Sequence, residues 1–129
     1  METRDCINFI LSNTQNAVYS YFKKKLQEFD ITPSQYSLLS CLRTQDGQTP
    51  SQLAQAMKLD TSSITGILGR TEKKDLIGRS YSQEDRRSVF IHLRPEGAAL
   101  LSQVDRVIEE ANAKITRGFD PQHYEQFLT

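Results

Sequence analysis

The stretch TPSQLAQAMKLDTSSITGILGRTEKK, Thr49–Lys74, decides the fold because it holds two helices joined by a very short turn. It opens with a threonine that can cap a helix, a proline in the first turn and a glutamine three residues after the cap. We expect a short helix from there, a break at Leu59-Asp60, and a second helix over Thr61–Lys74. The side chains expected to face inward are Leu53, Ala54, Met57, Ile64, Leu68 and Thr71. This arrangement predicts a helix-turn-helix.

Helices are also predicted before this stretch. The same capping pattern, TPSQ, occurs at Thr32–Gln35 and predicts a helix that Asp46-Gly47 ends. Further back, apolar residues recur at steps of three, four and seven and predict a long first helix from about Arg4 to Glu28. Its periodic residues are Ile7, Leu11, Val18, Phe22, Leu26 and Phe29.

After Lys74 the period of the apolar residues changes from 3.6 to 2. Residues 77–82 and 88–93 predict two strands, and residues 83–87 predict the turn between them. A hairpin directly after a helix-turn-helix predicts a wing. Pro95 then starts another long helix, which Gly118 is expected to end, and Asp120-Pro121 predicts the start of a last one.

These elements predict a fold that is mainly α with a small β-hairpin (α+β). A length of 129 residues suits a single domain, residues 1–129. Within it, a winged helix-turn-helix lobe at residues 31–94 is flanked by long N- and C-terminal helices at residues 4–30 and 95–129.

The composition excludes several classes of protein. No apolar run is long enough to span a membrane, and the N-terminus does not have the pattern of a secretory signal, so we expect no membrane partner. Only Cys6 and Cys41 are present, without metal-ligand spacing, which favours a reducing cytoplasm and no metal cofactor. The sequence has no nucleophile–base arrangement, phosphate-binding glycine loop or paired carboxylates. We therefore expect a protein that is not an enzyme and uses no cofactor.

The charge is balanced overall but unevenly distributed. Residues 58–94 carry eight basic and five acidic residues, whereas residues 95–129 carry three basic and six acidic ones. The first segment, with a net charge of +3, is therefore better suited to a polyanion.

The helix Thr61–Lys74 presents a small, polar and basic outer face when Ile64 points inward. Ser62, Gly66, Gly69 and Lys73 lie on this face, flanked by Ser63, Thr65 and Arg70. Glycine is unfavourable inside an exposed helix by about 1 kcal/mol relative to alanine, so two glycines on one face suggest close approach of a partner. Double-stranded DNA is the partner we expect, with hydroxyls and Arg70 reaching bases or phosphates in the major groove. The alternative is an ordinary solvated face.

The turn of the hairpin contains Asp85, Arg86 and Arg87. Arginines at a hairpin tip beside a recognition helix can enter the minor groove. Asp85 can hold an arginine side chain extended or bond the backbone of the turn. The alternative is a solvated turn with a weak surface ion pair.

Three stretches resemble the multiple-antibiotic-resistance regulator (MarR) family of winged helix-turn-helix repressors: ITPSQYSLLSCL, PSQLAQAMKLDTSSITGILGRTEKKDLIGRS and SQEDRRSVFIHLRPEGAALL. The resemblance covers about Ile31 to Leu101, and Asp85 with Arg87 matches the D-x-R signature of the family's wing. It implies a cytoplasmic, nucleoid-associated homodimer, held by the first and last helices, that binds a pseudo-palindromic operator. It places Thr61–Lys74 in the major groove and Arg87 in the minor groove.

The sequence departs from the family pattern at two positions. Asp75 stands where relatives usually have glycine at the end of the recognition helix, so we expect that turn to be built differently. Arg94 stands where a threonine commonly caps the following helix, and the loss of that cap costs about 1 kcal/mol.

Relatives that release DNA in response to a small aromatic ligand or an oxidant suggest where this chain could respond. Tyr19, Phe22 and Tyr36 could line a ligand pocket where the first helix meets the lobe, although aromatic residues at helical spacing often form core. Cys6 could sense oxidants, but it lies about two residues from the position expected for a sensing cysteine. Cys41 is expected in the core, and His92 and His123 are expected to lack partners for catalysis or metal binding.

Two other functions stay open on the sequence alone. A winged helix can bind a protein partner instead of DNA, in which case the arginines of the turn would be dispensable. A thiol-based redox-sensing repressor would instead depend on Cys6.

Overall fold

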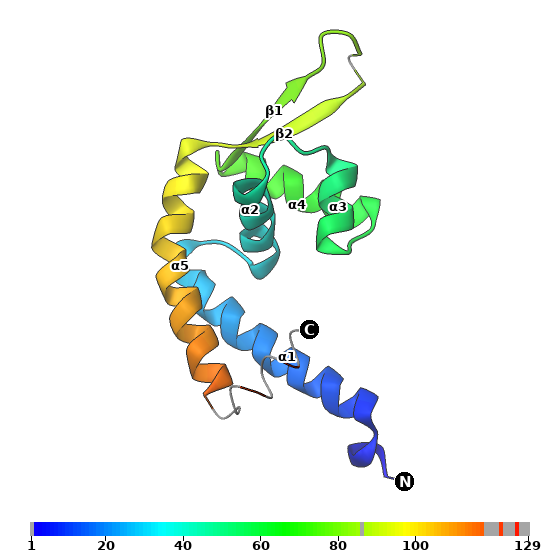
Figure 1. The fold of residues 1–129 in the computed structure, drawn as a ribbon, viewed down its shortest axis with the longest axis vertical. Helices are drawn as coiled ribbons and strands as arrows, with labels where there is room; N and C mark the ends of the chain where they lie inside the picture. Colours follow the sequence, from blue (N-terminus) through cyan, green and yellow to red (C-terminus); the bar gives the residue numbers. More distant parts are fainter. Residues whose placement is uncertain (1, 86, 118–121, 123–125, 127–129) are drawn as a thin grey trace.

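A computed structural model of the chain describes residues 2–85, 87–117, 122 and 126. The elements along the chain are α1 Ile7–Leu26, α2 Pro33–Thr44, α3 Pro50–Met57, α4 Thr61–Lys73, β1 Ile77–Tyr81, β2 Val89–Leu93 and α5 Pro95–Thr116. Short 3-10 turns, Thr3–Asp5 and Gln27–Phe29, flank α1. Figure 1 shows that α2, α3, α4 and the hairpin form a lobe from which α5 and α1 extend as two long rods. This confirms the predicted winged helix-turn-helix architecture.

Three helix starts follow from the capping residues of the sequence. Thr32 and Gln35 form a reciprocal pair at the start of α2, since each backbone N–H donates to the other's side chain, at 3.0 and 3.2 Å. Thr49 and Gln52 repeat the arrangement at the start of α3. At the start of α4 the Asp60 carboxylate accepts the Ser63 N–H at 2.7 Å. These bonds satisfy backbone donors that the first turn of a helix leaves free, which fixes where each helix begins.

The core of the lobe is built around α2. Leu38, Leu39 and Leu42 are at most 1% exposed, and α2 packs against α1, α3, α4, α5 and β2. Each such leucine contributes about 1.5–3 kcal/mol by leaving water. The side chains that meet α2 in this core include Leu26, Leu53, Ile64, Leu68, Ile77, Ile91 and Leu101.

The hairpin is extended by the segment that joins α2 to α3. The Ile91 N–H donates to the Gln48 carbonyl at 2.8 Å, and the Gly47 N–H donates to the Ile91 carbonyl at 3.0 Å. This pairing adds a third, very short strand-like segment beside β2. Ile91 is completely buried beneath it, so the wing is anchored at its root while its tip projects from the lobe.

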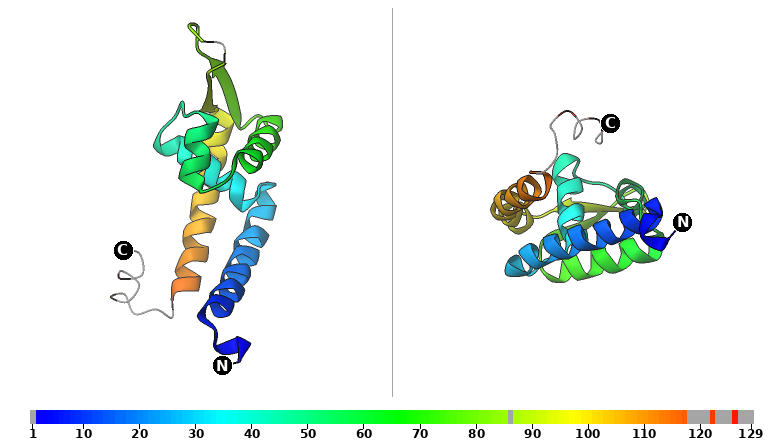
Figure 2. Two further views of the ribbon diagram at one scale, coloured as in Figure 1. Left: turned by 90° about the vertical axis from the view of Figure 1, so that its right-hand side faces the viewer. Right: turned by 90° about the horizontal axis from the view of Figure 1, so that it is seen from below.

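The two rods run side by side below the lobe, as the views of Figure 2 show, and α1 contacts α5. The Lys114 ammonium lies 5.7 Å from the centre of the Tyr21 ring, a cation–π contact between the rods. Of the residues in α1 only Leu26, at its end next to the lobe, is buried. None of the described helices is long and apolar enough to cross a membrane.

The first helix and β2 begin later than the sequence predicts, and β1 ends one residue earlier. Cys6 adopts an extended conformation after the turn Thr3–Asp5, so α1 starts at Ile7 and not at Arg4. Ser82 and Ser88 lie just outside the strands, although the Ser82 N–H still donates to the Ser88 carbonyl at 3.1 Å. The predicted end at Gly118 and the predicted last helix at Asp120-Pro121 lie outside the described residues.

The two departures from the family pattern have different outcomes. Asp75 adopts the left-handed conformation that glycine favours, with φ of 60°, so the turn is not rebuilt as expected. Aspartate tolerates this region better than most residues do. Arg94, in contrast, stands at the start of α5 without making a side-chain cap, as its sequence predicts.

Gly97 lets α5 approach the end of the helix-turn-helix very closely. A Cβ atom at this position would lie 2.3 Å from the Leu76 carbonyl oxygen and 2.8 Å from Leu93 Cδ1. The first of these is a backbone atom, which cannot move aside as the end of a side chain can. Gly97 therefore fixes where the start of α5 sits against the wing root.

We predict that Gly97→Ala lowers the free energy of unfolding by about 2–4 kcal/mol, because the added methyl group forces α5 away from Leu76. Gly69→Ala is the matched control, since a Cβ there meets nothing within 4 Å. That variant should be as stable as the wild type or up to about 1 kcal/mol more stable, because alanine favours the helix. Urea unfolding of both variants tests this, and equal stability of the two would contradict it.

Candidate DNA-binding interface

The outer face of α4 is open to solvent along its length. The residues predicted to bind DNA there are Thr61, Ser62, Ser63, Thr65, Gly66, Arg70 and Lys73. All are exposed except Gly66, which is half-buried, as is Gly69 on the same face. Ile64, Ile67, Leu68 and Thr71 hold the opposite face in the core. The helix is thus fixed on one side and free to enter a groove on the other.

Three of these side chains are oriented by contacts within the helix. The Ser62 hydroxyl donates to Asp60 at 3.0 Å and the Thr65 hydroxyl donates to the Thr61 carbonyl at 2.8 Å. Their oxygens stay available as acceptors for an amino group. The Arg70 guanidinium folds back over Gly66, with Nη1 3.2 Å from the position of a Cβ there. Gly66 therefore leaves room for the arginine to lie along the helix.

Hydrogen bonds lower the pKa of the Asp60 carboxyl group below its ordinary value. The Ser63 backbone N–H is the main donor, followed by the hydroxyls of Ser63 and Ser62. The carboxylate is therefore ionised at neutral pH at the start of α4, where the helix dipole also favours a negative charge.

The wing tip is closed by local hydrogen bonds. Asp85 accepts the Arg87 N–H at 2.9 Å and the Ser88 hydroxyl at 3.4 Å, while the Ser82 hydroxyl accepts the N–H groups of Glu84 and Asp85. The sequence left two roles open for Asp85: holding an arginine side chain extended, or bonding the turn. The contacts that the structure describes are those with the turn. Arg87 is left exposed at the tip, and Arg86 lies outside the described residues.

A hollow of about 690 Å³ separates the start of α4 from the wing. Thr61 and Ile64 line it from α4, Arg87 and Val89 from the wing, and Thr49 from the start of α3. The start of α4 and the wing thus flank one open channel, and Arg87 is among its lining residues.

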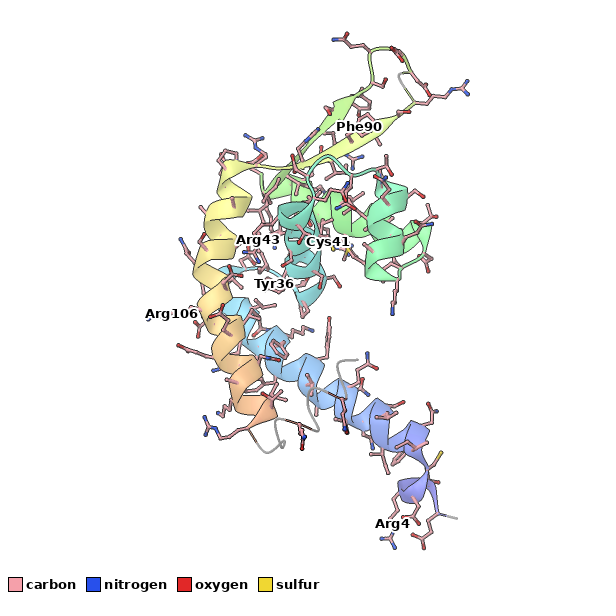
Figure 3. All side chains as sticks on the ribbon, in the orientation of Figure 1. Arg4, Tyr36, Cys41, Arg43, Phe90 and Arg106 are labelled. Atoms are coloured by element: carbon pink, nitrogen blue, oxygen red, sulfur yellow. The ribbon has the colours of Figure 1, made fainter. Side chains whose placement is uncertain are left out.

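A second cavity, of about 310 Å³, lies where α1 meets the lobe. The structure brings together here the three aromatic residues that the sequence suggested: Tyr19, Phe22 and Tyr36. Val18, Leu26, Pro33 and Ile108 complete its apolar wall, and the polar lining groups are Gln15, Ser37 and the two tyrosines. Figure 3 labels Tyr36 at this end of α2.

The two cysteines lie apart from both cavities. Cys6 is half-buried and immediately precedes α1, at the far end of the rod from the lobe. Cys41 is half-buried in α2 and packs against the core, as predicted. Within the described ranges no group of three or more His, Cys, Asp or Glu side chains could hold a metal ion.

His92 makes hydrogen bonds that the sequence did not suggest. Its Nδ1 lies 3.0 Å from Asp46 and its Nε2 lies 2.7 Å from the Ser80 hydroxyl. These residues come from β2, from the end of α2 and from β1, so only the folded chain brings them together. His123 lies outside the described residues.

Two contacts of charged side chains join segments that are distant in the sequence, and sequence reasoning missed both. Arg43 in α2 and Asp105 in α5 pair at 2.6 Å, and the hydrogen bond to Asp105 raises the pKa of Arg43 despite partial desolvation. The Lys74 ammonium, just after α4, binds the Asp30 carbonyl and lies 3.2 Å from Gln35. Charged residues at such sequence separations give no local pattern that would identify them.

A family model described as "MarR family" matches residues 31–89, which span the lobe and the wing. The chain is 32% identical over 100 residues to the organic hydroperoxide resistance transcriptional regulator of Bacillus subtilis, a match covering 78% of this chain and 68% of that protein. It is 29% identical over 122 residues to the homoprotocatechuate degradative operon repressor of Escherichia coli, covering 95% and 82%. Among the curated relatives it matches, the chain spans as little as 62% of one relative's length.

Solved structures agree with this relationship. The structure of CouR from Rhodococcus jostii RHA1 bound to p-coumaroyl-CoA superposes with a TM-score of 0.87 at 26% identity, covering 98% of this chain and 90% of that one. The likeness therefore includes both long helices as well as the lobe.

Proposed function

The chain belongs to the MarR family of transcriptional regulators, and we propose that it is a homodimeric DNA-binding regulator that represses transcription from a pseudo-palindromic operator. The observation that carries the proposal is the exposed face of α4 beside a wing that presents Arg87 across an open channel. Its relative from Escherichia coli is described as an operon repressor, which supports the direction of regulation.

The channel fits the path of one DNA strand. When α4 lies in the major groove and the wing reaches the neighbouring minor groove, the sugar–phosphate backbone between the two grooves passes between them. The hollow lined by Thr61 and Arg87 lies at this place. Arg70 and Lys73 extend the basic surface along α4 toward the flanking phosphates.

The contacts divide into those that give affinity and those that give selectivity. Phosphate contacts from arginine and lysine supply most of the affinity and make it dependent on salt. The hydroxyls of Ser62, Ser63 and Thr65 project toward base edges, where an oxygen can accept from an amino group in the major groove. The Asp85 side chain contributes indirectly, because its bond to the Arg87 N–H shapes the tip.

The N-terminal half of α1 supplies a surface for a second copy of the chain. Ile7, Phe9, Ile10 and Leu11 are 67%, 41%, 43% and 56% exposed, which is unusual for four large apolar residues within five positions. Ile7, Ile10 and Leu11 follow helical spacing and share one face. A dimer that covers them would hold two lobes on successive turns of DNA, about 34 Å apart.

The cavity between α1 and the lobe is the place we propose for an effector. Its walls are apolar and its polar groups, from Gln15, Ser37, Tyr19 and Tyr36, are all neutral. This lining suits an aromatic ring carrying phenolic hydroxyls. A ligand wedged here would change the angle between α1 and α2, and with it the spacing of the two lobes.

We predict that selection from a random duplex pool enriches an inverted repeat, and that Arg87→Ala weakens binding to it about 10- to 100-fold by removing a minor-groove contact. Arg106→Ala removes the same charge from an exposed position on α5, away from the wing (Figure 3), and should bind as the wild type does. Fluorescence anisotropy at several salt concentrations measures both. Unchanged affinity of Arg87→Ala, or no enriched sequence, would favour a protein-binding wing instead.

We predict that Leu11→Asp converts the dimer into a monomer, because a carboxylate would be buried without a partner. Asn13→Asp adds the same charge to an exposed position two residues away and should leave the dimer intact. Sedimentation velocity distinguishes the two species. A Leu11→Asp variant that stays dimeric would show that this face of α1 is not the interface.

We predict that a panel of hydroxylated aromatic compounds, homoprotocatechuate included, contains a ligand that releases the selected DNA. Phe22→Trp should abolish that release while DNA binding persists, because the larger ring fills the cavity. Tyr21→Trp is the control, since Tyr21 does not line it. Release that is equally strong from Phe22→Trp would place the effector elsewhere.

A further inference from the structure

The root of the wing holds a chain of three side chains, Asp46, His92 and Ser80. One Asp46 oxygen lies 3.0 Å from His92 Nδ1, and the other accepts the Leu93 N–H at 2.7 Å. His92 Nε2 lies 2.7 Å from the Ser80 hydroxyl. The end of α2 is thereby bonded to both strands of the hairpin.

Gly47 brings the histidine ring into place. It adopts φ of 73°, and the position of a Cβ there would lie 3.4 Å from the His92 ring. The ring therefore rests against the backbone of the turn that carries Asp46. Across the hairpin, Gly78 is the register partner of His92, and the aliphatic stem of Arg94 lies against it.

The same three residue types form the hydrogen-bonded chain of serine hydrolases. Neither of the cavities described above is lined by Asp46, Ser80 or His92, so neither would bring a substrate to this serine. The bond of Asp46 to the Leu93 N–H instead indicates a role in holding β2. The chain is better explained as a joint between helix and wing.

The hydrogen bonds require a defined proton arrangement. An ionised carboxylate only accepts, so Nδ1 carries a proton and, in the neutral ring, Nε2 accepts the Ser80 O–H. Although partial burial opposes it, the Leu93 N–H and His92 together lower the pKa of Asp46, which keeps this carboxylate ionised. When the ring takes a second proton, the bond to Asp46 becomes charge-assisted and Ser80 becomes the acceptor. Both bonds survive, and the first strengthens.

Among the described residues, few other charges lie near the histidine. Arg94 lies next to it, with its aliphatic stem 3.8 Å from the position of a Cβ at Gly78, and its charge pairs with Glu96 at 3.5 Å. Arg79 of β1 pairs with Glu72 of α4. Because Arg79 alternates with Gly78 and Ser80 along β1, its side chain lies on the other face of the hairpin. Asp46 is thus the acid in direct contact with His92.

We propose that Asp46, His92 and Ser80 are positioning residues of the wing, and that the wing holds DNA more tightly when His92 is protonated. Histidine is the side chain that ordinarily changes charge between about pH 5 and pH 8. The added proton strengthens the tie between α2 and β2 and adds a positive charge at the wing root. Because the protonated protein binds DNA more tightly, bound DNA in turn favours protonation of His92. Formation of the complex is therefore accompanied by uptake of a proton. This inference rests on the proposed DNA-binding function.

The test measures the affinity of the full chain for its selected operator at constant ionic strength from about pH 8 to about pH 6. We expect the wild type to bind about three- to tenfold more tightly at the lower pH. His92→Gln should bind with no such dependence. Asp46→Asn should show a smaller one, because asparagine has a single acceptor oxygen for the two N–H donors that the carboxylate accepts and carries no charge to strengthen the bond to a protonated ring. His123→Gln, which removes the other histidine of the chain, should respond as the wild type does.

A second measurement needs no DNA and reports the joint itself. In ¹⁵N-detected NMR of the wild type, the neutral His92 ring should carry its proton on Nδ1, and Asp46→Asn should shift it toward Nε2. An Nε2–H ring in the wild type overturns the proposal. So does an operator affinity that depends on pH equally in the wild type and in His92→Gln. Absence of any operator binding by the wild type would instead overturn the proposed function.

Discussion

The burial of α2 is the constraint on which the other elements depend. Its leucines at positions 38, 39 and 42 are withdrawn from water, and α2 contacts α1, α3, α4, α5 and β2. Because interiors are packed at crystal-like density, these contacts leave α2 little freedom to move independently of its neighbours. Any displacement of α2 is therefore passed on to α3, α4 and the hairpin.

This position makes α2 a physical link between the two regions to which we assign function. Tyr36, near its start, lines the cavity under α1, and Asp46, just beyond its end, holds His92 at the wing root. A helix of the length of α2 is about 18 Å long. The cavity under α1 and the wing root are therefore separated by one short, rigid helix. Between them, Arg43 ties the helix to Asp105 of α5. A ligand in the cavity and a proton at the wing root would thus act on the same element from opposite ends.

The residues assigned to DNA differ physically from those that build the lobe. Ile64, Leu68 and Thr71 fix α4 by burial, whereas the described hydrogen bonds of the Ser62 and Thr65 side chains are to Asp60 and Thr61 at the start of the helix, and Arg70 lies over Gly66. Such short-range restraints orient a side chain without tying it to the core. They leave the surface ready to pair with a partner at little cost in conformational entropy.

The sequence alone determined what depends on neighbours along the chain. Capping residues fixed the starts of α2, α3 and α4, apolar periods fixed their buried faces, and the change of period located the hairpin. The same reasoning identified Thr61–Lys74 and the Asp85–Arg87 turn, because a recognition helix and a wing are continuous segments. Only the tertiary structure decided what depends on distant segments meeting. The bonds of Asp46 to His92 and Leu93 span 46 and 47 residues, and the contact of Gly97 with the Leu76 carbonyl is an approach that no periodicity encodes. Hydrogen bonds and packing at such separations arise from the three-dimensional path of the backbone, which a local pattern of side chains does not contain.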